Sequence, residues 1–361
     1  MKKLLAMILA IAMTASLLTG CGGKKDDAAS SGSSGSSTTT STQTGTQKPA
    51  DDKVYTIKLG HVQPDDAATA RACVYFKEII EEKSAGRILV DIYSNSALGS
   101  ERELTEMLEA GSVQMISVGD CGMGNVIWPE LNVLEAPFLF HNQEEVLTAM
   151  ESDYAAQLVE DIYENTNTYI MGWLYRGGRH LFTKDPVKTP ADIKGMKIRV
   201  PEVDVYLATF NTLGCNVTPI AYSELYSSLQ TGVVDGFEGM YDLTYGNRFY
   251  EVVDYCCTIG WCWTFAPLAV SKQFYESLPA DLQAILKECV DLACQKNIEL
   301  TLDSEANLEQ SFIDQGVEIY HPNVDDWANL FTEEVIADMA SCWNDPNSTD
   351  LYYAWQAAAK G

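Results

Sequence analysis

The stretch Lys194–Pro201, KGMKIRVP, has the pattern of a β-strand with one buried face. Apolar and basic residues alternate along it, which is the two-residue period of a half-buried strand. Pro201 ends the strand, because a proline nitrogen has no hydrogen to donate to a neighbouring strand. Arg199 therefore lies at the carboxyl end of the strand, where open α/β sheets present their ligands.

This position allows two interpretations of Arg199. A structural arginine would pair with a nearby acid, such as Glu202 or Asp204. A ligand-binding arginine would use its planar guanidinium, which forms two parallel hydrogen bonds with a carboxylate. The strand end favours the second interpretation modestly, and the local sequence leaves both open.

Strand-like and helix-like segments alternate on both sides of this stretch. We expect strands at residues 55–59, 88–92, 113–118 and 168–175, and helices at about 66–86, 100–111, from about 203, and at 279–300. Ser100 and Glu103 form an S-x-x-E capping box at one helix start. Such alternation predicts βαβ units and a largely parallel sheet. No linker rich in proline or glycine separates the two halves, so we expect two lobes that share crossing segments.

The first residues, MKKLLAMILAIAMTASLLTGC, have the features of an export signal. Two lysines precede an apolar core, Leu4–Leu18, that is too short and too early for a membrane span. The run Leu-Thr-Gly-Cys resembles the lipobox of bacterial lipoproteins, in which Cys21 carries the lipid; the alternative is an ordinary secretory signal with a chance cysteine. Residues 22–52 lack large apolar side chains and should form a disordered tether. We expect a signal peptide at 1–21 and an extracytoplasmic protein, lipid-anchored to the outer face of the cell membrane.

The whole chain has a formal net charge of -27, from 51 acidic and 24 basic residues. No basic stripe could neutralise phosphates, which argues against nucleic-acid binding. A positive pocket can still form locally on an acidic protein, so an anionic ligand is compatible with this charge.

The cysteines do not suggest a disulfide framework. Ten are present, and assigning Cys21 to the lipid leaves nine, an odd number that cannot pair completely within one chain. Their neighbours are largely apolar, so we expect most of them to be buried thiols. A zinc site made by Cys256, Cys257, Cys262 and His180 is the alternative, but no C-x-x-C spacing supports it. We predict no metal and no other cofactor.

Two segments could carry nucleotide-binding or catalytic chemistry. Residues 119–125, GDCGMGN, have the spacing G-x-x-G-x-G rather than G-x-G-x-x-G, and Pro129 interrupts the helix that a phosphate site needs. We interpret this segment as a loop whose backbone amides and Asp120 line a cleft. Asp235 and Glu238 could be the paired carboxylates of a hydrolase, but Asp-Gly is also a turn signal, and we prefer the turn. No G-x-S-x-G or H-E-x-x-H motif is present.

Several long motifs, in a fixed order, resemble the solute-binding proteins of TRAP transporters. They are SNSALGSERELTEMLEAGSVQM, APFLF, GRHLFTKDPVKTPADIKGMKIRVP, GCNVTPIAYSELYSSLQTGVVDGFEGM, NRFYEVVDY and VSKQFYESLP. The resemblance runs from about Ile57 to about His321 with few gaps.

The resemblance implies a two-lobed, periplasmic-binding-protein-like α/β fold. Each lobe would be a mixed sheet flanked by helices, with a long helix and strands crossing between the lobes. We expect lobe 1 at 53–172 plus about 265–305, and lobe 2 at 173–264 plus about 306–361. The implied function is to capture an organic acid between the lobes and deliver it to the membrane subunits of a TRAP transporter, without catalysis. A secreted lipoprotein enzyme acting on acidic sugars is the competing hypothesis.

The resemblance also implies roles for individual residues. The arginine of the family's IRVP motif, which clamps the ligand carboxylate, is Arg199 here. A second cleft arginine corresponds to Arg179, and the loop of the LGSER motif supplies Glu101 or Arg102. The full set of expected ligand-contacting residues is Val62, Glu101, Gly119, Asp120, Trp173, Arg179, Arg199, Glu202, Tyr222, Phe237, Gly239 and Trp261.

Two departures from the family pattern bear on the ligand. The family commonly has DGQENP where this chain has DGFEGM, so Phe237 and Gly239 replace two polar residues. Trp261 takes the place of a histidine or another polar group. With aromatic walls and fewer polar contacts, we expect a sugar acid or an aromatic carboxylate rather than a small dicarboxylate.

Overall fold

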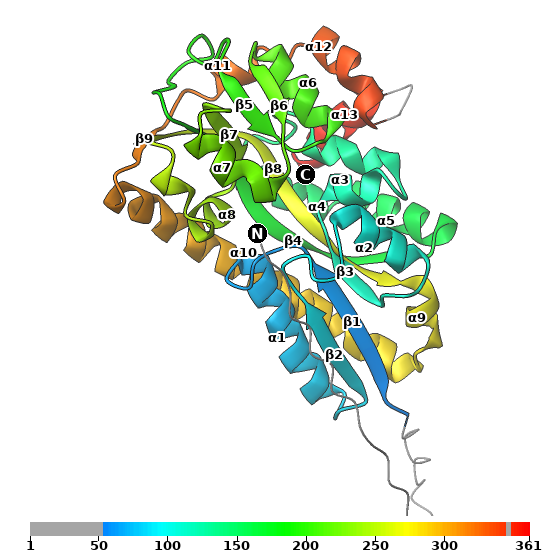
Figure 1. Ribbon diagram of the computed structural model, residues 1–361. Helices are drawn as coiled ribbons and strands as arrows, with labels where there is room; N and C mark the ends of the chain where they lie inside the picture. Colours follow the sequence, from blue (N-terminus) through cyan, green and yellow to red (C-terminus); the bar gives the residue numbers. More distant parts are fainter. Residues whose placement is uncertain (1–52, 344–347) are drawn as a thin grey trace, which may run out of the picture. The chain divides into compact units, whose positions relative to one another are not determined.

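One mixed β-sheet organises residues 53–343 and 348–361, the parts of the chain that the computed structural model describes (Figure 1). Cys21 and the predicted tether lie outside these residues, so the predictions for them stay predictions. The strands are β1 (Tyr55–His61), β2 (Ile88–Tyr93), β3 (Met115–Ser117), β4 (Thr168–Thr183), β5 (Lys197–Val200), β6 (Asn216–Pro219), β7 (Gly236–Gly239), β8 (Tyr255–Ser271) and β9 (Glu318–Tyr320).

Helices connect these strands. The α-helices are α1 (Ala68–Lys83), α2 (Glu101–Glu109), α3 (Asp120–Gly124), α4 (Gln143–Met150), α5 (Asp153–Asn165), α6 (Asp204–Thr212), α7 (Leu225–Gln230), α8 (Tyr241–Gly246), α9 (Lys272–Ser277), α10 (Ala280–Asp314), α11 (Asp325–Ala328), α12 (Glu333–Asp338) and α13 (Ser348–Ala358). Short 3-10 helices are η1 (Pro129–Glu135), η2 (Tyr222–Glu224), η3 (Phe249–Glu251) and η4 (Met339–Trp343).

Two long strands, β4 and β8, join the two halves of the sheet. The strand order is β2-β1-β3-β8-β4-β7-β5-β6, and β9 pairs with β8. The two strands pair antiparallel with each other along most of their length. One end of β8 pairs with β3, whereas the opposite end of β4 pairs with β7. The two outer groups of strands, parallel within themselves, therefore share β4 and β8. This arrangement confirms the expected mixed sheet and its crossing strands; the lobe boundaries stay a prediction.

A single long helix, α10, also crosses the molecule. It contacts α1, β4, α8 and β9, which belong to different groups of strands and helices (Figure 1). The predicted helix ended at Leu300, but α10 continues to Asp314. The physical reason is in the sequence: the first glycine or proline after the helix start is Gly316, so nothing stops the helix earlier.

Local sequence signals explain the elements around the future site. The capping box of α2 is present: Glu103 N–H donates to Ser100 Oγ (3.3 Å), and Ser100 N–H donates to Glu103 Oε2 (2.8 Å). The glycine-rich segment after β3 was predicted as a loop, and this is wrong. It forms the short helix α3 directly after Gly119, and Pro129 starts η1, as suits a residue without an N–H group.

The core contains most of the aliphatic and aromatic side chains and several cysteines. Free and buried thiols include Cys73, Cys215, Cys256, Cys257 and Cys289. Between residues 53 and 361, gaps aside, no cluster of His, Cys, Asp and Glu has the arrangement of a metal site. No described helix combines the length and the hydropathy that crossing a bilayer needs.

Candidate ligand-binding site

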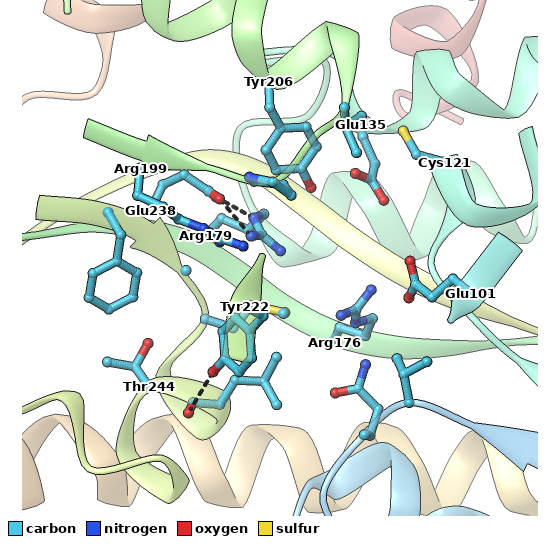
Figure 2. A pocket seen from close by; sticks show the side chains of 18 of the residues that line it. Glu101, Cys121, Glu135, Arg176, Arg179, Arg199, Tyr206, Tyr222, Glu238 and Thr244 are labelled. Carbon is cyan, nitrogen blue, oxygen red and sulfur yellow. Dashed lines mark hydrogen bonds and ion pairs between the residues drawn. The ribbon is translucent and has the colours of Figure 1, made fainter. Parts of the chain in front are cut away.

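A cavity of about 260 Å³ lies at the carboxyl ends of β1, β5 and β7, beside the middle of β4 (Figure 2). Its position follows the rule that open α/β sheets bind ligands beyond their strand ends. Its charged lining residues are Glu101, Glu135, Arg176, Arg179, Arg199 and Glu238. The uncharged ones are Val62, Gln63, Pro64, Ser96, Cys121, Pro201, Val203, Tyr206, Tyr222, Phe237, Gly239, Met240, Leu243 and Thr244.

Arg199 reaches the cavity from the end of β5, and the residue is only 4 % exposed. Its Nε donates to the carbonyl of Ile220 (2.8 Å), and its guanidinium lies over the ring of Tyr222, 5.7 Å from the centroid. Among the described residues, no carboxylate forms an ion pair with it, so the structural alternative, pairing with Glu202 or Asp204, is wrong. Arg199 is a buried cation whose terminal nitrogens face the cavity (Figure 2).

The electrostatic surroundings of Arg199 favour an anion. Burial is the main cause that lowers its pKa, and nearby Arg179 lowers it further, whereas Glu238 opposes both. Burial removes the Arg199 guanidinium from water, and a ligand carboxylate would supply the counter-charge that this cation then needs.

Arg179 differs because its guanidinium already has a partner. Its Nε donates to Glu238 Oε2 (2.5 Å) and its Nη2 to Glu238 Oε1 (2.9 Å), a bidentate and buried ion pair. Burial opposes the charge of Arg179, but Glu238, together with Tyr206 and Glu135, outweighs burial and holds the pKa of Arg179 well above its usual value. The ring of Tyr206 lies 5.0 Å from the same guanidinium. Asp235 is the other carboxylate of the hydrolase alternative. It accepts from Lys197 N–H (2.9 Å) and does not line the cavity.

Arg176 enters the cavity because β4 contains a bulge. Tyr175 pairs with Phe265 and Gly177 with Thr264, so Arg176 has no partner on β8. In a regular strand, residues three apart point to opposite faces. The extra residue shifts the alternation, and Arg176 and Arg179 both line the cavity (Figure 2). The sequence prediction missed Arg176, although two glycines between two arginines in a strand are a signal for a bulge.

Gly119 packs behind Glu101 and Glu135, two acids that line the cavity. Its N–H donates to Glu101 Oε1 (3.0 Å). A Cβ atom here would lie 2.9 Å from Arg176 Nη1, 3.4 Å from Glu101 Oε1 and 3.5 Å from Glu135 Oε1. The three charged groups therefore surround one point, and only glycine leaves them room. The side chain of Asp120 is not among those described, so its predicted role is not tested.

The predicted aromatic wall is only partly present. Phe237 lines the cavity and stacks on Phe182, with ring centroids 5.3 Å apart. Trp261 is fully buried and packs edge-on against Tyr206 and Phe210, so the prediction that it lines the cleft is wrong. Trp173 lies outside the cavity too, against Phe265. Trp261 belongs to the core, where burial of a large ring is most favourable, whereas Trp173 is partly buried at the edge of the core.

The other predicted residues divide in the same way. Val62, Glu101, Tyr222 and Gly239 line the cavity, together with Arg179, Arg199 and Phe237. Glu202 does not line it: Glu202 is exposed, whereas its neighbours Pro201 and Val203 line the cavity. Arg102, the alternative to Glu101, is exposed and pairs with Glu106 (3.5 Å).

Sequence analysis missed several lining residues besides Arg176, namely Gln63, Glu135, Tyr206, Glu238 and Thr244. Glu238 could have been found, because the glutamate is common to the family pattern DGQENP and to DGFEGM here. No signal in the sequence marks Glu135 or Tyr206, which the fold brings to the cavity from η1 and α6.

Comparisons with known proteins identify the family of this chain. The model of the bacterial extracellular solute-binding proteins, family 7, matches residues 59–341. The C4-dicarboxylate-binding periplasmic protein DctP of Rhodobacter capsulatus is 26% identical over 273 residues, 76% of this chain and 82% of that protein. A TRAP periplasmic solute-binding protein of a Sulfitobacter species with bound β-D-galacturonate is 25% identical with a TM-score of 0.78, covering 84% of this chain and 100% of that chain.

A TRAP periplasmic solute-binding protein of Chromohalobacter salexigens with bound D-glucuronate is 26% identical, with a TM-score of 0.78. The likeness covers 84% of this chain and 99% of that one. These neighbours share the two-lobed fold, as the sequence analysis expected. Because the family model spans most of the chain, this chain belongs to the bacterial extracellular solute-binding proteins of family 7.

Proposed function

We propose that the cavity binds a sugar acid through one carboxylate and that the protein delivers this acid to the membrane subunits of a TRAP transporter. One observation carries the ligand assignment: Arg199 is buried, and no described acid forms an ion pair with its guanidinium. Arg179 is paired with both carboxylate oxygens of Glu238. Arg176 has no ion pair among the described residues either, but Glu101 and Glu135 lie around the same point as its Nη1, so a ligand carboxylate there would meet two acids. The ligand carboxylate therefore binds at Arg199, with two parallel hydrogen bonds from the guanidinium.

The rest of the lining suits hydroxyl groups. Glu101, Glu135 and Glu238 are hydrogen-bond acceptors when ionised, and a sugar hydroxyl is a donor to such groups. Phe237 and the rings of Tyr206 and Tyr222 provide flat surfaces for a sugar ring. The three arginines and the three glutamates of the lining balance in formal charge. With one ligand carboxylate bound, the lining and ligand together already carry one uncompensated negative charge, so like-charge repulsion disfavours a second carboxylate.

The named ligands of the relatives fit this proposal and its competitor. Galacturonate and glucuronate, bound in two structural neighbours, are ring-shaped acids with one carboxylate. The Rhodobacter relative is named for C4-dicarboxylates, which have a second carboxylate. Aromatic monocarboxylates would also pair with Arg199 but would offer no hydroxyl donors to Glu101, Glu135 and Glu238.

The test is a thermal-shift series at equal concentrations of D-galacturonate, D-glucuronate, benzoate, malate and succinate, followed by calorimetry. Ligand binding raises the melting temperature by mass action. We expect the uronates to give the largest shifts, and a tighter affinity for succinate or malate would refute the proposal. Product analysis of the same mixtures tests the enzyme alternative, since a binding protein releases its ligand unchanged.

Lipid anchoring forms the second part of the proposal. Cys21 follows the Leu-Thr-Gly run and precedes a long polar segment, which would let the binding unit move near the membrane. Cys21→Ser should release the protein from membranes into the soluble fraction. Unchanged membrane retention of this variant would overturn the anchor.

A further inference from the structure

The bulge that carries Arg176 is held from behind by helix α10. Bulges leave backbone groups without partners in the ladder. Here Thr301 Oγ1 donates to the carbonyl of Tyr175 (3.0 Å), and Glu305 Oε1 accepts from the N–H of Gly178 (3.1 Å). Thr301 and Glu305 are four residues apart and so lie on one face of α10. The two side chains bracket the segment between Tyr175 and Gly178.

The close approach of Glu305 depends on the backbone of Gly177. This glycine has φ of +88°, and a Cβ atom on it would lie 2.3 Å from Glu305 Oε1. No other residue type could adopt this conformation and leave the carboxylate in place. Glu305 is largely withdrawn from water, and desolvation is the main cause that raises its pKa to about 7. A carboxylate held in such surroundings is not a solvated surface group.

We propose that Thr301 and Glu305 are positioning residues for ligand binding, because they fix the β4 bulge that directs Arg176 and Arg179 into the cavity. This inference rests on the proposed function for its effect on affinity. The bracketed segment contains Arg176 and ends directly before Arg179, so its backbone sets where both side chains begin. Since α10 also contacts α1 and α8, the same helix carries the packing of both groups of strands.

A double-mutant cycle separates positioning from plain stabilisation. Glu305→Ala, Arg176→Ala and the double variant are compared with wild type by calorimetry with D-glucuronate, well below each melting temperature. We expect Glu305→Ala to weaken binding about tenfold, and to cost much less when Arg176 is already absent. Glu305→Gln keeps an acceptor for Gly178 N–H and should restore most of the affinity. Glu299→Ala, a change on the same helix at a residue paired with Lys296, is the matched control and should change nothing.

Hydrogen exchange of the peptide covering residues 172–180 provides a reading that does not depend on the ligand. Exchange should rise in Glu305→Ala and stay at the wild-type rate in Glu305→Gln and Glu299→Ala. Thr301→Val serves the same purpose if Glu305→Ala does not fold. Unchanged exchange, or an affinity loss that is equal with and without Arg176, would overturn the inference. If wild type binds no acid, the proposed function fails, while the exchange data still decide whether the helix holds the bulge.

Discussion

The end of β5 and the middle of β4 both supply arginines to the cavity, but they do so in different ways. Arg199 follows a regular strand alternation, and its Nε donates to the carbonyl of Ile220, while no described acid pairs with its guanidinium. On β4, Arg179 is saturated by Glu238, and Arg176 depends on a bulge. Arginine thus forms a buried ion pair on β4, at Arg179, whereas at the end of β5 the guanidinium of Arg199 has no ion-paired acid and, as we propose, binds the ligand. The nearby acid makes this difference, and motif position does not reveal it.

The largest expected effect concerns the buried ion pair between Arg179 of β4 and Glu238 of β7. Glu238→Ala leaves Arg179 as a buried charge without a partner, which should lower the free energy of unfolding by about 3–5 kcal/mol. Urea unfolding of the ligand-free protein measures this loss. Glu238→Gln keeps one acceptor, so its free energy of unfolding should lie between those of Glu238→Ala and wild type. Equal stability of all three proteins would mean that the pair is not a structural element.

The opposite behaviour is expected at the end of β5. Arg199→Ala should weaken uronate binding by about 2–5 kcal/mol, because the ligand charge is left unpaired in a closed site. Arg199→Lys should also bind weakly, since an ammonium cannot make two parallel hydrogen bonds with a carboxylate. Calorimetry on both variants, with Arg102→Ala as the exposed control, checks this. If Arg199→Ala destabilises the fold as much as Glu238→Ala and leaves the affinity for uronates intact, Arg199 has a structural role and the contrast between the two regions is wrong.

Regular periodicity made the first region predictable. The alternation in KGMKIRVP placed Arg199 at a strand end, and the capping box located α2 with Glu101 at its start. Both signals are local, so a short stretch of sequence is enough to determine them.

The second region could not be predicted in the same way. The bulge at Arg176 arises from pairing with β8, about ninety residues further along the chain, and no local period encodes that register. The prediction for Trp261 is wrong for a related reason. The motif position shows that a tryptophan replaces a polar residue, but strand alternation and the packing of α6 decide which side of the sheet its ring occupies. Glu135 and Tyr206 reach the site only through tertiary packing.

The smallest expected effect tests the surroundings of the bulge through pH. The pKa of Glu305 is raised from 4.5 to about 7, first by desolvation and further by Asp242. Other titratable groups near it are Tyr175, His180, Tyr241, Glu309 and His321, and His141 lines a second cavity together with Glu305. Between about pH 4.5 and 7 the folded protein holds a proton on Glu305 that the unfolded chain has lost. Its contribution to stability therefore falls as pH rises through this window and is fully lost above pH 7.

Glu305→Gln removes this titration and keeps the acceptor for Gly178 N–H. The variant should gain stability relative to wild type as pH rises from 5 to 8, by about 1–3 kcal/mol, since one pKa unit corresponds to about 1.4 kcal/mol. Urea unfolding of both proteins at several pH values measures the difference, in which the shared titrations of the neighbouring histidines and acids cancel. Glu299→Gln, at an exposed position of the same helix, should show no such slope. A difference between Glu305→Gln and wild type that stays constant with pH would mean that Glu305 ionises as it does in water, and α10 would then hold the bulge without a desolvated carboxylate.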